Sequence, residues 1–184
     1  MLLVACSETE TVETPVTVAN QAAITVIQNA RIIDAVSNSA TENAILIIEN
    51  GHIQNIGTAG NITVPEGATV INMAGKTLMP GMINMHGHVG RRYEMAYGPE
   101  YYSFDTTHRD ANSYLYFGVT HSTSLGQDWP PMMEFINAQR AGQVGGAHLY
   151  TGEYGFTVTG GFQGNNPFAH KPNTPEEARV MVQQ

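Results

Sequence analysis

The segment Leu78–Gly90, "LMPGMINMHGHVG", constrains the chain most, because it separates two different sequence patterns. Before it, apolar runs divided by turn residues favour β-strands. After it, short apolar runs alternate with helical patterns. Within it, a proline–glycine pair is followed by mostly apolar residues and then by two histidines that flank one glycine. We therefore expect the architecture to change at Pro80.

The part of the chain before Pro80 is expected to form a small antiparallel β unit. Residues 24–34 are rich in β-branched side chains, and residues 44–57 contain two apolar runs joined by Asn50-Gly51. An Asn-Gly pair favours a two-residue hairpin, because both residues tolerate a positive φ. A further strand is expected at residues 68–73.

After Pro80 the pattern predicts parallel βα units, because strands alternate with helices of about 10 to 15 residues. The last expected helix opens with Thr174 as N-cap and Pro175 at its first position, followed by acidic residues that the helix dipole favours. The expected strands are 81–89, 118–125 and 147–152, and the expected helices are 107–117, 130–142 and 174–184.

His86 and His88 are the candidate metal ligands. Side chains alternate along a strand, so residues two apart point to the same side, and two neutral imidazoles can bind one zinc, iron, nickel or copper ion. The alternative is a pair of hydrogen-bonded polar residues at a strand end. The pair ends the first strand of a βα series, where parallel α/β folds gather their active sites, which favours the metal interpretation.

The order of four segments resembles the amidohydrolase superfamily of metal-dependent hydrolases, and its imidazolonepropionase-like branch in particular. Asn84 stands where many members have aspartate, which removes a charge beside the expected site, and His121 stands where threonine is usual. The segments are "NARIID", "AILIIENGHIQNIG", "GATVINMAGKTLMPGMINMHGH" and "YFGVTHSTSLG".

The resemblance implies an α/β fold in which residues 24–79 form part of a β-sandwich and residues 80–184 begin a (β/α)8 barrel. Such a barrel takes about 250 residues, whereas the segment after Pro80 is long enough for about three units of about 30 residues each. We therefore expect the N-terminal portion of such an enzyme, with an incomplete barrel.

The same resemblance implies that His86 and His88 are the first two ligands of one or two divalent metal ions, with zinc expected. The family's bridging lysine, two further histidines and catalytic aspartate are expected beyond Gln184. Neither Lys76, in a turn, nor Lys171, in a polar loop, fits the bridging role. Catalytic and substrate-binding residues are therefore not assigned within this chain.

The implied function is hydrolysis of carbon–nitrogen bonds in cyclic amides, other non-peptide amides or dipeptide-like substrates by metal-activated water. Two imidazoles leave zinc short of the three or four protein ligands that its sites use. We therefore expect the 184-residue chain to lack hydrolase activity by itself. The alternative is a surface lipoprotein or binding module without catalysis.

The charge of the chain excludes one class of partner. Its formal net charge is −8, from 8 Lys+Arg against 16 Asp+Glu. Nucleic-acid binding requires a basic surface, so nucleic acid is not expected as a partner.

The only cysteine, Cys6, lies in "LVAC", which resembles the lipobox of bacterial lipoproteins. Too few residues precede it for a working signal peptide, so lipidation would require a start further upstream. Residues 1–23 would then be a truncated signal and a polar tether. The protein would be anchored in the cell envelope, as a periplasmic or outer-membrane lipoprotein; without a real signal it would be cytoplasmic.

The remaining histidines and loops carry weaker expectations. His52 is expected to be exposed and His108 to be a surface or helix-capping residue, whereas His121 could face the same mouth as the histidine pair. Residues 91–104 are expected to form a long loop that either contacts substrate or only packs on the barrel. The glycine-rich segment 157–167 lacks both phosphate-binding spacings and is expected to be another loop at the mouth.

Overall fold

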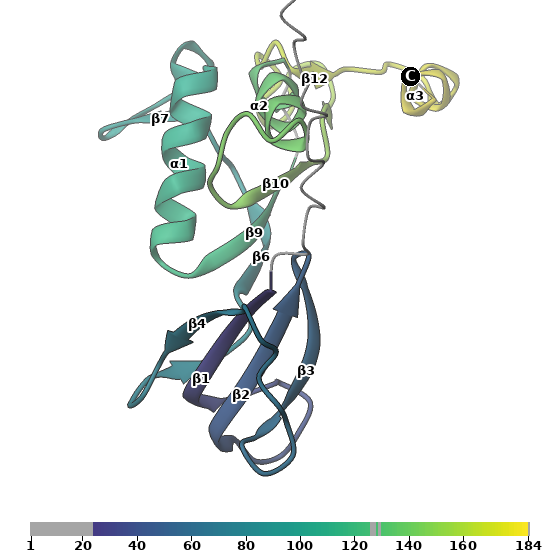
Figure 1. Cartoon of the computed structure of the whole chain (residues 1–184). Helices are drawn as coiled ribbons and strands as arrows, with labels where there is room; N and C mark the ends of the chain where they lie inside the picture. Colours follow the sequence, from purple (N-terminus) through teal and green to yellow (C-terminus); the bar gives the residue numbers. More distant parts are fainter. Residues whose placement is uncertain (1–23, 126–127, 129, 184) are drawn as a thin grey trace, which may run out of the picture. The chain divides into compact units, whose positions relative to one another are not determined.

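A computed structural model describes residues 24–125, 128 and 130–183 (Figure 1). The chain divides into two compact units at Met79/Pro80, and each is described by itself. The predicted lipidation site Cys6 and the tether 1–23 lie outside the described residues. In the described part of the chain, no helix is both long enough and apolar enough to span a bilayer.

The first unit is a five-stranded sheet with the order β3-β2-β1-β4, in which β5 also pairs with β1. The predicted hairpin is confirmed: Asn50 and Gly51 have φ values of 51° and 77° and connect two antiparallel strands. The strands are β1 (Ile24–Ile32), β2 (Thr41–Glu49), β3 (His52–Thr58), β4 (Thr69–Asn72) and β5 (Thr77–Leu78).

The expectation of an antiparallel unit is only partly correct, because β4 and β5 run parallel to β1. The segment between β3 and β4 crosses from one edge of the sheet, past β2 and β1, to the opposite edge. There β4 pairs with β1 and runs in the same direction. Hairpins are encoded by local turn residues. A crossover of this kind depends on tertiary packing, which local patterns do not reveal.

The two central strands, β1 and β2, have buried side chains on both faces of this sheet. Val26 and Ile45 pack with Ile62 on one face, whereas their neighbours Ile27 and Leu46 belong to a second cluster on the other. Adjacent residues of a strand point to opposite faces. This arrangement explains why β1 and β2 contain continuous apolar runs where a half-exposed strand would alternate.

The second unit contains a parallel three-stranded sheet with the order β10-β9-β6. The predicted strands and helices are confirmed, with small shifts at their ends, and Thr174 caps the last helix through the Glu177 N–H. The main elements are β6 (Met82–Gly87), α1 (Phe104–Tyr116), β9 (Val119–Ser124), α2 (Pro131–Arg140), β10 (His148–Thr151) and α3 (Pro175–Val182).

Short elements fill the connections of the second unit. Arg92–Tyr93 and Ala96–Tyr97 form the antiparallel pair β7–β8, followed by a 3₁₀ turn, Pro99–Tyr101. Gly155–Phe156 and Ala169–His170 form the parallel pair β11–β12 on either side of the glycine-rich loop.

One face of the parallel sheet is covered by α1 and α2 (Figure 1). Met132 and Phe135 of α2 are fully buried against Ala111 of α1 and Leu149 of β10. Side chains on β6 outside this cluster stay in solvent, including Met85, which is 69% exposed. The unit is therefore a mixed α/β layer with one covered face.

Gly90 is expected to tolerate no side chain. It has a φ of +81°, and a Cβ there would lie 2.5 Å from the Thr107 hydroxyl oxygen and 2.7 Å from the Tyr102 ring. We expect Gly90→Ala to lower the free energy of unfolding by about 2–4 kcal/mol, from left-handed strain plus overpacking.

The matched control is Gly142→Ala, because Gly142 has a φ of +70° and a Cβ added there would meet no atom within 4 Å. Its expected cost is the backbone strain alone, about 1 kcal/mol. Urea denaturation of both variants measures the difference. Equal costs would show that the space around Gly90 is not as tight as described.

Candidate metal centre

A β-bulge in β6 determines which way the histidines face. Asn84 is opposite Ser122 and Gly87 is opposite Ser124, so β6 has one residue more than β9 over this interval. A Cβ added at Gly87 would lie 3.0 Å from the Asn84 Nδ2 atom and 3.0 Å from the Tyr114 hydroxyl oxygen. Asn84 and Gly87 therefore face the same side, toward α1, which an uninterrupted strand would not allow.

The bulge changes the expected role of Asn84. Its amide donates to the Tyr114 hydroxyl (3.1 Å) and to the Ser122 hydroxyl (3.2 Å), and its Oδ1 accepts the His86 N–H (3.2 Å). The Asn84 side chain reaches toward α1, where it hydrogen-bonds to Tyr114, a residue that also lines the hollow that His88 borders. Its contact with the His86 backbone makes it a support for the histidine segment.

His86 and His88 are both exposed, and their rings lie edge to face, with centroids 5.3 Å apart and an interplanar angle of 83°. Two imidazoles bound to one tetrahedral zinc at about 2.0–2.1 Å place their ring centres about 5 Å apart. The separation of the two rings therefore matches that of two imidazoles on one metal ion. His88 is the first residue after β6 and also borders a hollow along α1 with Asp110 and Tyr114.

His121 does not join this pair. It pairs with Ile83, near the start of β6. Its ring stacks on that of His148, with centroids 5.2 Å apart and an interplanar angle of 20°. The lone pair of an imidazole nitrogen lies in the ring plane, so nearly parallel stacked rings direct their lone pairs past each other. No group of three or more His, Cys, Asp or Glu side chains suited to a metal ion occurs among the described residues.

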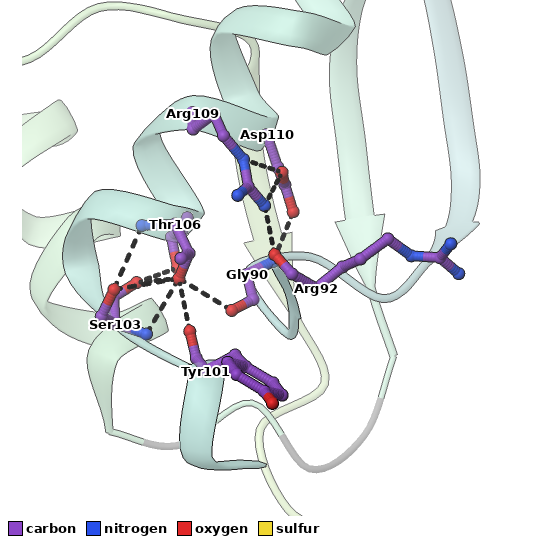
Figure 2. A network of polar contacts seen from close by, with 8 residues as sticks. Gly90, Arg92, Tyr101, Ser103, Thr106, Arg109 and Asp110 are labelled. Carbon is purple, nitrogen blue, oxygen red and sulfur yellow. Dashed lines mark hydrogen bonds and ion pairs between the residues drawn. The ribbon is translucent and has the colours of Figure 1, made fainter. Parts of the chain in front are cut away.

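The loop after the histidines is tied to the start of α1 (Figure 2). Thr106 Oγ1 lies 2.8 Å from the Gly90 carbonyl oxygen and 3.0 Å from those of Tyr101 and Ser103, so these three acceptors share its single proton. The Gly90 N–H donates to Asp110 Oδ2 at 2.9 Å. These contacts hold the segment that follows His88 against the first two turns of α1.

A buried ion pair lies at the same end of the sheet. Arg91 is 3% exposed, Asp128 is fully buried, and Arg91 Nη2 lies 3.7 Å from Asp128 Oδ1. Thr151, at the end of β10, donates to Asp128 Oδ2 at 3.1 Å, whereas Oδ1 has no hydrogen bond among the described residues. Burial raises the pKa of Asp128, opposed by a hydrogen bond from Ser124 and by the charges of Arg91 and His88.

Part of the loop 91–104 therefore packs inside the unit. The Tyr102 ring lies 5.8 Å from the Arg91 guanidinium carbon, and its hydroxyl donates to the Asp128 carbonyl. Burial, together with the negative charge of Asp128, raises the pKa of this hydroxyl. Asp128 was not identified from the sequence as a buried polar residue of this edge. Its position a few residues after the end of β9 was the available indication.

Two further histidine predictions had different outcomes. His52 is exposed at the start of β3, as predicted. His108 is half-buried within α1, with its ring 5.7 Å from that of Phe135, so its predicted surface position is wrong. His108 lies on the side of α1 that packs against Phe135 of α2. The sequence of α1 alone does not reveal which of its sides contacts α2.

We expect the buried carboxyl of Asp128 to make stability depend on pH. The pKa of Asp128 is higher in the folded protein than in the unfolded chain, so the folded protein binds the proton more tightly. The resulting contribution to stability is complete below the unfolded-state pKa and is lost as the pH rises through the folded-state pKa. The stability of the parent protein relative to Asp128→Asn should therefore fall as the pH rises above the ordinary aspartate pKa of about 4.

Urea midpoints measured at increasing pH for the parent and for Asp128→Asn test this expectation. Asp105→Asn, in the exposed first turn of α1, controls for loss of one carboxylate. A relative stability that increases with pH would mean that attraction to Arg91 outweighs burial.

Comparison with known proteins identifies related sequences and folds. No family model matches the sequence. A 63-residue stretch is 36% identical to a dihydroorotase of Pelobacter propionicus, and it covers 34% of this chain and 14% of that protein.

Solved structures match over most of this chain. A Xaa-Pro dipeptidase with bound methionine in its active site has a TM-score of 0.74 and 19% identity, over 88% of this chain and 44% of its own. A prolidase complexed with N-methylphosphonate-L-proline has a TM-score of 0.71 and 21% identity, over 87% and 43%.

An amidohydrolase matches with a TM-score of 0.69 and 19% identity, over 87% of this chain and 43% of its own. These structures establish the fold, and the chain spans less than half of their length. Together with the dihydroorotase match, they show that part of the chain is similar to hydrolases of the amidohydrolase type.

Proposed function

We propose that this chain supplies the first metal ligands, His86 and His88, of a metal-dependent hydrolase that cleaves carbon–nitrogen bonds. The observation that carries the proposal is the position of the pair: two adjacent imidazoles at the carboxyl end of the first parallel strand, with a ring separation of 5.3 Å. In barrel enzymes this end of the strands carries the active site.

A divalent metal bound there would lower the pKa of a bound water toward about 7 and polarise the scissile carbonyl. The chain's own residues orient the ligands. The bulge in β6 lies between Asn84 and Gly87, and Asn84 Oδ1 accepts a hydrogen bond from the His86 backbone N–H. Gly90, Thr106 and Asp110 hold the segment that follows.

Further metal ligands would have to come from additional strands, because a catalytic zinc uses three protein ligands and this pair provides two. In the proposed complete protein these strands would continue the sheet into a (β/α)8 barrel. The uncovered face of the parallel sheet supports this proposal, since Ile83 and Met85 on β6 are 63% and 69% exposed.

For the substrate, we propose a small dipeptide-like amide or a cyclic amide. Support comes from the names of the matching proteins, which include a Xaa-Pro dipeptidase, a prolidase complexed with a phosphonate of proline, and a dihydroorotase. The side chains that would select among these substrates are not assigned.

Zinc is expected to perturb the rings of His86 and His88 and to leave those of His121 and His148 unchanged. The reason is ring orientation: the first pair is nearly perpendicular at 83°, whereas the second is stacked at 20°. Long-range proton–nitrogen spectra of the histidine rings during zinc titration report each residue separately.

Either His86→Asn or His88→Asn should weaken zinc binding by at least about tenfold, since loss of even an outer partner of a ligand costs 10–100-fold. His52→Asn, an exposed histidine in the other unit, is the control. Zinc shifts confined to His121 and His148 would refute the assignment.

The zinc-loaded 184-residue chain by itself is expected to show no turnover of Xaa-Pro dipeptides, N-acyl amino acids or cyclic amides, because two imidazoles do not complete a catalytic zinc site. Release of amine or of ring-opened product measures this. Zinc-dependent turnover that disappears in His86→Asn would show that the chain carries a complete centre.

A further inference from the structure

A second hollow lies at the carboxyl end of β10, built from residues that the proposed metal centre does not use. Its volume is about 290 Å³, near the lower end of the about 300–1,000 Å³ typical of small-molecule sites. It is lined by Gly152, Glu153, Tyr154, Phe156, His170, Met181 and Val182.

Three aromatic rings form one wall of this hollow. His170 lies between the other two, 4.5 Å from the Tyr154 ring and 5.1 Å from the Phe156 ring, with interplanar angles of 42° and 41°. Phe156 and His170 are register partners in the β11–β12 pair, and the Thr157 N–H donates to the His170 carbonyl at 2.9 Å. Strand pairing therefore holds the backbones of Phe156 and His170 side by side.

Glu153 gives the hollow a negative charge. No lysine or arginine is among its lining residues, and the Glu153 carboxylate has no ion pair among the described residues. The backbone of Glu153 has a φ of +55°, which is held by its N–H donating to Thr151 Oγ1 (2.7 Å) and its carbonyl accepting from the Asp128 N–H (3.1 Å). A strained non-glycine residue of this kind persists only where its surroundings hold it.

We propose that this hollow binds a small organic cation, such as a quaternary or primary ammonium group. The faces of Tyr154 and Phe156 attract cations through their quadrupole, the interaction that aromatic cages use to bind quaternary ammonium ligands. The carboxylate of Glu153 adds charge attraction at the rim, and Met181 and Val182 of α3 give an apolar wall for the ligand's methyl groups. The hollow uses neither of the two proposed metal ligands, so its test requires no catalysis.

The first measurement is a titration of the protein with choline, and separately with its neutral isostere in which carbon replaces the quaternary nitrogen. Chemical shifts of the Phe156 and His170 ring protons report binding, at an ionic strength of about 0.15 M to screen diffuse attraction to the acidic chain. We expect choline to bind in the millimolar range and about tenfold more tightly than the isostere.

Variants locate the site. Glu153→Gln should weaken choline binding about fivefold and leave the neutral isostere unaffected, since only the charge term is lost. Phe156→Leu should weaken choline through loss of a π-face. Glu134→Gln, an exposed carboxylate on α2 outside the hollow, is the matched control and should have no effect.

Several results would overturn the proposal. Absence of shifts with choline would exclude the site, and equal affinity for the neutral isostere would reduce it to an apolar depression. Equal weakening by Glu153→Gln and Glu134→Gln would show only general attraction to a negatively charged protein. Backbone proton–nitrogen spectra establish that each variant remains folded.

Discussion

The β-bulge between Asn84 and Gly87 is the constraint on which the functional edge of the second unit depends. Side chains alternate along a strand with a period of two, so one additional residue reverses every side chain that follows. Asn84 faces Tyr114 and Ser122, and Val89 enters the buried cluster with Phe135 and Leu149. The histidines between them are thereby kept out of the apolar core.

The same end of the parallel sheet collects the other polar groups of the unit. The histidine pair follows β6, Asp128 follows β9, and Thr151 ends β10. Parallel strands place their carboxyl ends at one edge, so residues distant in sequence become neighbours there. Removing one partner of a buried ion pair leaves an unpaired charge in the interior, which is strongly destabilising. Arg91 and Asp128 form such a pair, and it connects the loop after β6 to the loop after β9.

Much of the fold could be predicted from local patterns. The Asn50-Gly51 hairpin, the α1, α2 and α3 helices and the strands β6, β9 and β10 were all expected, because each depends on turn residues, capping residues or a periodic apolar pattern within a short window. Three features were missed: the parallel pairing of β4 and β5 with β1, the inward position of His108, and the use of Asn84 on the helix side. Each depends on contacts between segments separated in sequence.

The sequence by itself determined that two histidines separated by one glycine end the first strand of a βα series, and this pattern suggested both the resemblance to amidohydrolases and the candidate ligands. Only the tertiary structure decided which histidines lie together and in what orientation. His86 and His88 meet edge to face, whereas His121 and His148 stack. Strand register and the bulge set these orientations, and both arise from pairing between strands about 30 residues apart. A linear pattern gives the types of ligand present, but the direction of each lone pair follows from packing.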